Sequence, residues 1–507
     1  MVQPQVQDLG DAQATALLAL LVVVPVAAYT ARWSLRRHLR RLMATASGSP
    51  TGTDDPVGQD TAPSAALRFT TLDAGVGHPD AVAAREALAR RARARLRTAF
   101  LVELAATAGY LILLMGILGD MGVLLLSFNG AAYLVYVAFR YFRNRGQLHA
   151  VDTRSRAVRW AETAVAILVG LVTLGRIRLS QSLAARADRQ HHLRPAWQAL
   201  QTLLLPLLAG VIGSVLALTG TPAGLGLVAF AALHAGVLWL LRSRADRHPG
   251  VGVLVLRVFD VDANARFTFG GLLAFWHHLG PFFTVVDSSF WKHGNRADSW
   301  GQALALVGLA AWGLTVSILS SEFGAVPEDV APWVGIPAVL AAVAVWVWTA
   351  RRLMGRQFIG SADQLARRLR RLDRHPFSLA LTYRALPTMC RDDTWRSTVR
   401  TLTTRADVVL MDLRGFSDAR KGCAWEVEYL LDVKPLDRIL FLVDRDTDPG
   451  PVHRLLEASW QRLDGASPNL AQAAPEARLY HAGVQDDADV QGILDALVGA
   501  AAAGQPA

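Results

Sequence analysis

The sequence predicts an α-helical polytopic membrane bundle joined to a cytosolic α/β domain with a doubly wound, mainly parallel sheet. The first observation is composition, because 52% of the residues are apolar and only 19% are charged, whereas soluble domains are about a quarter charged. The second is that long apolar blocks fill the chain up to about residue 355. The third is that strand and helix patterns alternate in the more charged remainder, as in α/β domains.

Seven apolar blocks have the length of a membrane-spanning helix, which needs about 20 mainly apolar residues. Helices are expected because every backbone amide must be bonded internally in hydrocarbon. The apolar stretch 163–175 is too short to span and is interpreted as interfacial, although counting it would give eight spans. The seven blocks lie near residues 14–31, 99–118, 121–139, 199–218, 223–241, 301–320 and 332–350.

The arginines between the blocks predict an orientation. They fill alternate loops, while the complementary loops at 119–120, 219–222 and 321–331 contain neither Lys nor Arg. Positively charged loops stay on the cytoplasmic side. The chain is therefore expected to be a multi-pass protein of the cell membrane, with the lipid bilayer as partner, the N-terminus outside and the C-terminus in the cytosol.

The net charge of +10 does not by itself indicate a nucleic-acid partner. Only Lys292, Lys421 and Lys434 are lysines, and the arginines cluster beside the apolar blocks. Membrane orientation explains that distribution, so no nucleic-acid binding is expected. A homo-oligomer is left open.

The sequence gives little indication of a metal site or of disulfide bonds. The two cysteines, Cys390 and Cys423, cannot form a disulfide framework or a four-cysteine metal site. Gly415 and Gly422 do not form a phosphate-binding glycine motif. No metal site and no cofactor are evident, although NAD or a nucleotide is considered as a ligand.

The chain is expected to comprise four regions, one of which is a hairpin formed by the last two spans. Residues 45–65 read as a flexible linker and residues 78–97 as a basic helix along the inner leaflet. The predicted regions are 1–249, a membrane region with about five spans and basic cytosolic loops; 250–298, the first part of the α/β domain; 299–353, a transmembrane hairpin that interrupts it; and 354–507, its remainder.

Short apolar runs bounded by turn residues predict the strands, and helical spacing between them predicts the helices. The expected strands lie at 253–256, 282–286, 377–383, 408–411, 439–443 and 477–481. The expected helices lie at 263–279, 361–373, 393–405, 423–432, 452–463 and 487–501.

Charged and polar residues gather where these strands end. In doubly wound sheets ligands bind outside the carboxyl ends of the strands. The loop 413–422 is also longer than the usual connection of about 2–6 residues, and its charges suit a phosphate- or ribose-bearing ligand. The alternative is that Asp and Ser only cap the turns. The candidate ligand-binding residues are Arg257, Asp260, Asp287, Asp412, Arg414, Ser417 and Asp444.

Four segments resemble the core of TIR-like and nucleoside 2-deoxyribosyltransferase-like domains: 393–396, 406–412, 422–428 and the opening strand at 254–260. The last is similar to the start of such domains in bacterial multi-span membrane proteins. The resemblance implies a flavodoxin-like sheet and a catalytic glutamate on the helix after the fourth expected strand. Glu426 or Glu428 would then attack or stabilise the ribosyl carbon as an N-glycosidic bond breaks. In the alternative interpretation, Glu428 is exposed on an amphipathic helix without catalytic function.

Three functions follow. The leading hypothesis is a membrane-anchored signalling sensor or effector whose TIR-like cytosolic domain binds a nucleotide-type ligand or protein partners. The alternative is an enzyme that cleaves an N-glycosidic bond in NAD or a nucleoside. The third is a small-solute transporter, for which Glu103 and His234 are the ionisable residues within the spans. His234 is more simply interpreted as a hydrogen-bonded packing residue.

Overall fold

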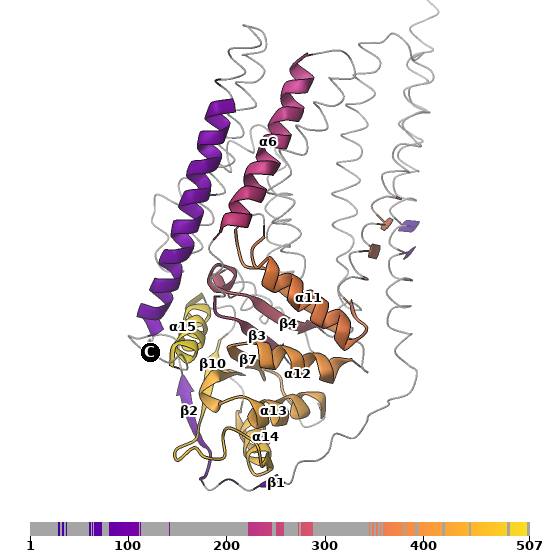
Figure 1. Ribbon diagram of the computed structural model, residues 1–507. Helices are drawn as coiled ribbons and strands as arrows, with labels where there is room; N and C mark the ends of the chain where they lie inside the picture. Colours follow the sequence, from indigo (N-terminus) through magenta and orange to yellow (C-terminus); the bar gives the residue numbers. More distant parts are fainter. Residues whose placement is uncertain are drawn as a thin grey trace, which may run out of the picture. The chain divides into compact units, whose positions relative to one another are not determined.

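The structure is a computed structural model (Figure 1). It describes residues 65–72, 81–110, 222–245, 250–257, 275–286, 358–378, 381–390, 394–417, 421–445, 448–483 and 487–503, with separate positions at 29, 30, 33, 34, 37, 60, 61, 63, 112, 141, 272, 344, 347, 348, 351, 352 and 355. The chain divides into two compact units. The larger comprises 54–285, 362–387 and 397–507, and the smaller comprises 1–53, 286–361 and 388–396.

A parallel β-sheet forms the centre of the larger unit. Its order is β2-β10-β8-β7-β3-β4, and β6 and β5 continue the same order to eight strands. The pairings from β2 to β4 and the β5–β6 pair are parallel. The strands are β2 (Arg68–Leu72), β3 (Val253–Arg257), β4 (Phe282–Val286), β5 (Phe358–Ile359), β6 (Ala385–Cys390), β7 (Val408–Asp412), β8 (Ile439–Asp444) and β10 (Glu476–Ala482). A separate antiparallel pair joins β1 (Asp60–Thr61) to β9 (Leu463–Asp464).

The α/β part of the predicted fold is confirmed. The predicted strands at 253–256 and 408–411 lie side by side, with Leu254 opposite Val409 and Arg257 opposite Asp412. Numbered among themselves, the five strands β4-β3-β7-β8-β10 follow the order 2-1-3-4-5 of flavodoxin-like sheets. The strand order reverses between β3 and β7, so their carboxyl ends flank the switch point of the sheet.

Both faces of this sheet are covered, as is usual for parallel sheets. On one face Val253 and Leu410 pack in one cluster with Trp276 and with Ile493 of α15 (Asp487–Ala503). Leu254 and Val409 alternate with that set and are also fully buried. The other helices of the α/β part are α11 (Ala362–Arg374), α12 (Trp395–Arg405), α13 (Lys421–Val433) and α14 (Gly450–Trp460).

One glycine is required where β3 and β4 begin. A Cβ on Gly280 would lie 1.9 Å from the carbonyl oxygen of Val251. The nearby amide of Val251 donates to the carbonyl of Leu279 at 3.2 Å, and that of Val253 donates to Pro281 at 3.0 Å. Any larger residue at 280 would push the two strand starts apart.

Two long helices contact each other in the larger unit: residues 81–110 and α6 (Pro222–Arg244) (Figure 1). His234 of α6 is fully buried, and its Nε2 lies 3.1 Å from the hydroxyl of Thr107. Its Nδ1 donates to the carbonyl oxygen of Phe230 at 3.0 Å. His234 is thus a hydrogen-bonded packing residue, which agrees with the simpler interpretation of this histidine.

The predicted polytopic membrane bundle is wrong. In the part of the chain that the structure describes, no helix is both long and apolar enough to cross a membrane. The predicted span 99–118 begins inside a helix that already includes residue 81 and that buries Glu103. The predicted span 223–241 falls on α6, which buries Phe230, His234 and Leu238 along one face.

The physical reason is that apolar helix positions can serve contacts within the protein, and a count of apolar residues does not separate these from contacts with lipid. The membrane-protein classification and the multi-pass location, with its external N-terminus and cytosolic C-terminus, are wrong for the same reason. The other predicted spans, including most of the hairpin, lie outside the described residues.

The structure also differs from the expected local structure at three places. The expected strand at 377–383 contains one antiparallel bridge, between Phe377 and Tyr383, and a turn at Leu381 with φ of 58°. The strand β6 follows this turn. Strand β2 was not predicted, and β1 lies in the segment expected to be a flexible linker.

Candidate functional site

The two predicted catalytic glutamates lie on α13 in different surroundings. Glu426 is 1% exposed and shares the buried side of the helix with Cys423 and Leu430. Glu428 is partly exposed and accepts a hydrogen bond from Arg462 at 2.6 Å. Glu426 is therefore covered, and Glu428 is occupied by an ion pair. Their catalytic role stays a prediction.

Three of the predicted ligand-binding residues meet at the carboxyl ends of β7 and β8. The buried carboxylate of Asp412 accepts two hydrogen bonds from the Arg414 guanidinium, from Nε at 2.9 Å and from Nη2 at 3.0 Å. The backbone amide of Gly415 donates to Asp444 at 3.1 Å. A phosphate that approached Arg414 would have to displace the paired carboxylate of Asp412, because the two charges already balance.

The other predicted ligand-binding residues make no described side-chain contact at this edge of the sheet. Ser417 is exposed in the loop after Gly415. The backbone of Arg257 lies opposite Asp412 across the β3–β7 pair. Asp260 and Asp287 lie outside the described residues. The carboxyl ends of β3, β7 and β8 thus place Arg257, Asp412 and Asp444 at one edge of the sheet, and the ligand-binding role of these residues stays a prediction.

Metal binding is not indicated in the described ranges. They contain no group of three or more His, Cys, Asp or Glu side chains that could hold a metal ion.

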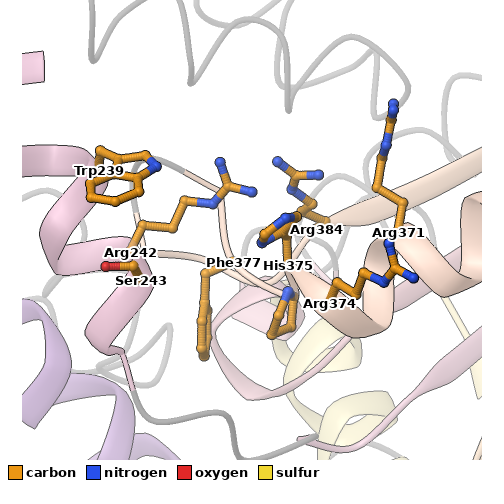
Figure 2. Close-up of a pocket in the computed structure, with 9 residues that line it drawn as sticks. Trp239, Arg242, Ser243, Arg371, Arg374, His375, Phe377 and Arg384 are labelled. Atoms are coloured by element: carbon orange, nitrogen blue, oxygen red, sulfur yellow. The ribbon is translucent and has the colours of Figure 1, made fainter. Parts of the chain in front are cut away.

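A cationic pocket of about 320 Å³ lies near the amino end of β6, away from the predicted edge (Figure 2). Three chain segments form it: the C-terminal turns of α6, the end of α11, and the segment 375–384 that leads into β6. The lining residues are Trp239, Arg242, Ser243, Arg371, Arg374, His375, Pro376, Phe377 and Arg384.

The charge of this pocket is unbalanced. Four lining residues are arginines, and the lining residues that the structure describes include no Asp or Glu. Asp373 of α11 lies beside two of these arginines in the sequence, but it pairs with Arg405. None of the four guanidinium groups makes a hydrogen bond or ion pair with another described residue.

Arg384 is in the least favourable position for a charge. Burial lowers the pKa of its guanidinium, and the positive charges of Arg242 and Arg371 lower that pKa further. Like charges and desolvation both disfavour the charged form. An anion bound between these arginines would act in the opposite direction and stabilise all three charges.

The segment 375–384 is held from its other side by Arg95, on the helix over residues 81–110. The guanidinium carbon of Arg95 lies 4.8 Å from the ring centre of Phe377 and 5.2 Å from that of Tyr383. Its Nη2 also donates to the carbonyl oxygen of His278 at 3.0 Å. These two cation–π contacts hold the ends of the turn between Phe377 and Tyr383, and the pocket residues His375 and Arg384 flank that turn.

Sequence reasoning missed the pocket for an identifiable reason. Its arginines come from two helices and a turn that are distant in the sequence, so no motif joins them. The arginines beside the apolar blocks, Arg242 among them, were explained by membrane orientation. The available signal was α11 itself, in which Arg367, Arg370, Arg371 and Arg374 are all exposed while only one aspartate lies among them.

No family model matches the chain, and no curated protein or solved structure is significantly similar to it. The resemblance to TIR-like domains therefore stays a prediction.

Proposed function

We propose that the protein binds a multiply charged, phosphate-bearing anion in the pocket between α6, α11 and the segment 375–384. The observation that carries the proposal is that four arginines without a carboxylate partner among the described residues line one pocket. Guanidinium groups match phosphate oxygens through paired hydrogen bonds.

The number of arginines favours several phosphates over one carboxylate. A carboxylate would balance one of the four charges, whereas each phosphate group brings about one to two negative charges. Two guanidinium groups on the order of 8 Å apart repel by about 2 kcal/mol at an effective dielectric constant near 20. Solvent weakens this repulsion for the exposed Arg371 and Arg374, but less for the half-buried Arg242 and Arg384.

A binding role fits the pocket better than N-glycosidic cleavage. That reaction needs a carboxylate beside the ribosyl carbon, and no carboxylate is found among the described lining residues. Ligand binding, which the sensor hypothesis placed at the carboxyl ends of the strands, is therefore proposed for this pocket instead.

Calorimetric titration of the full chain with inorganic triphosphate at low ionic strength tests this proposal. The double variant Arg371→Ala/Arg374→Ala should weaken binding by at least about tenfold, because a hydrogen bond to a charged group contributes about 1.5–3 kcal/mol. Both side chains are exposed, so the fold should persist.

The matched control is Arg367→Ala/Arg370→Ala, which removes two exposed arginines of the same helix that do not line the pocket. It should bind triphosphate nearly as well as the wild type. Absence of binding to the wild type, or equal losses in the two double variants, would contradict the proposal.

A further inference from the structure

The pocket has an aromatic end in addition to its arginines. Trp239 is 65% exposed and lies on α6 one turn before Arg242, so the two side chains share a helix face. Figure 2 shows the indole at one end of the pocket and Arg371 at the other, with Arg242 and Arg384 between them. The chemistry therefore changes along the pocket from a flat apolar surface to a cluster of positive charge.

Among the described residues, the ring of Trp239 is open, whereas the exposed rings of Trp33 and Trp348 are each covered by an arginine. The arginine four residues later lies over the ring of Trp33 at 5.2 Å and over that of Trp348 at 5.1 Å. In α6 that position is Ser243, whose hydroxyl donates to the carbonyl oxygen of Leu240 at 2.9 Å. The indole has no ring or cation contact with any described residue.

We infer that the anion is a nucleotide, whose base stacks on Trp239 while its phosphates are held by Arg371, Arg374 and Arg384. This inference rests on the proposed anion binding and adds the class of ligand. An aromatic surface accepts any base, because every base has a π-face. A volume of about 320 Å³ is at the lower end for small-molecule sites, which suits phosphates and ribose inside the pocket and a base at its rim.

Inorganic triphosphate and ATP separate anion binding from nucleotide binding, because both contain three phosphates and only ATP has a base. Calorimetry on the full chain without divalent cations should show that ATP binds more tightly. Base–aromatic stacking predicts a difference of about 5- to 150-fold. Trp239→Leu should remove most of that difference and leave triphosphate affinity unchanged.

Two further variants make the assignment specific. Leu240→Ala changes an exposed apolar neighbour that does not line the pocket, and it should preserve the preference for ATP. Ser243→Arg would place a guanidinium over the indole, as in the Trp33 pair. It should remove the preference for ATP while retaining triphosphate binding.

Each outcome supports or overturns the inference. A preference for ATP that disappears in Trp239→Leu and persists in Leu240→Ala supports it. Equal affinities for ATP and triphosphate, or equal losses for both ligands in Trp239→Leu, overturn the nucleotide assignment and leave anion binding intact. If neither ligand binds, the proposed function fails and the inference fails with it.

Discussion

Asn469 shows how a single buried polar residue joins several parts of the backbone. It is fully buried, and its Oδ1 accepts a hydrogen bond from the amide of Leu436 at 2.8 Å. Its Nδ2 donates to the carbonyl oxygens of Leu431 at 2.6 Å and Lys434 at 2.8 Å. These bonds fix the turn between α13 and β8, and they satisfy three backbone groups that are shielded from water.

Replacing Asn469 by Ala should destabilise the protein strongly. The change leaves the buried amide of Leu436 and the carbonyl of Lys434 without this partner, whereas the carbonyl of Leu431 keeps its hydrogen bond from Ser467 at 2.8 Å. We therefore expect a loss of about 2 kcal/mol or more in the free energy of unfolding. Denaturant titration followed by circular dichroism measures this loss. Gln472→Ala is the control, because it removes only one hydrogen bond to the same Oδ1, at 2.9 Å, and should cost less than about 1.5 kcal/mol. Similar losses in the two variants would contradict this account.

At the level of elements, an ion pair between Arg85 and Asp495 connects the helix over residues 81–110 to α15. Both side chains are largely buried. Burial raises the pKa of Asp495 above its ordinary value of 3.8, although Arg85 acts in the opposite direction. The net direction indicates that desolvation of the carboxylate outweighs the attraction of its partner.

This raised pKa predicts a pH dependence of stability. The folded state holds the Asp495 proton more tightly than the unfolded chain does, so the contribution to stability is greatest below pH 3.8 and is lost as the pH rises through the raised pKa. Asp495→Asn cannot ionise. Its free energy of unfolding should therefore increase relative to the wild type between about pH 4 and pH 7.

Denaturant unfolding of both proteins at several pH values in that interval checks the prediction. Asp363→Asn, on the exposed side of α11, controls for the substitution itself. A difference between wild type and Asp495→Asn that stays constant with pH would contradict the assignment.

The elements that could be predicted from the sequence are those with a continuous apolar pattern. Val253 to Leu256 and Ile439 to Val443 are unbroken apolar runs, and both are central strands. Strand β6 was misplaced because Pro387 and Thr388 interrupt its apolar pattern. Strand β2 was missed because Thr70 and Thr71 leave it without a continuous apolar run, although threonine is common in strands.

For the candidate sites, the sequence predicts where strand ends meet but not which side chains pair there. The carboxyl edge of the sheet could be predicted, because strand ends are visible in the sequence and parallel strands bring them together. The pairing of Asp412 with Arg414 could not be, since it depends on side-chain geometry. The arginine pocket depends on the tertiary approach of α6 to α11, for which the local pattern gives no signal.

At the level of the whole molecule, Arg95 links the long helix to the pocket without lining it. Arg95→Met would keep much of the side-chain volume but remove the cation that holds Phe377 and Tyr383. We expect a several-fold weaker affinity for triphosphate and faster amide exchange in the segment 375–384, because a cation–π contact contributes about 0.5–2 kcal/mol. Calorimetry and hydrogen-exchange mass spectrometry measure the two effects.

Arg97→Met provides the control, since this arginine is exposed on the same helix. It should leave both triphosphate affinity and exchange in the segment 375–384 unchanged. If Arg95→Met bound triphosphate as the wild type does, Arg95 would have no part in positioning the pocket.

The pairing of β2 with β10 also has a consequence for synthesis on the ribosome. The hydrogen-bonded residues Thr70 and Glu476 are 406 positions apart, and β2 occupies one end of the sheet, beside β10. At about 5–20 residues per second, the ribosome needs about 20–80 s to deliver the second partner after the first. During that interval β2 lacks the strand β10 beside which it pairs, and the helix over residues 81–110 lacks α15, to which Arg85 is joined. Correct folding of the nascent chain therefore depends on keeping its N-terminal half from premature association until translation is nearly complete.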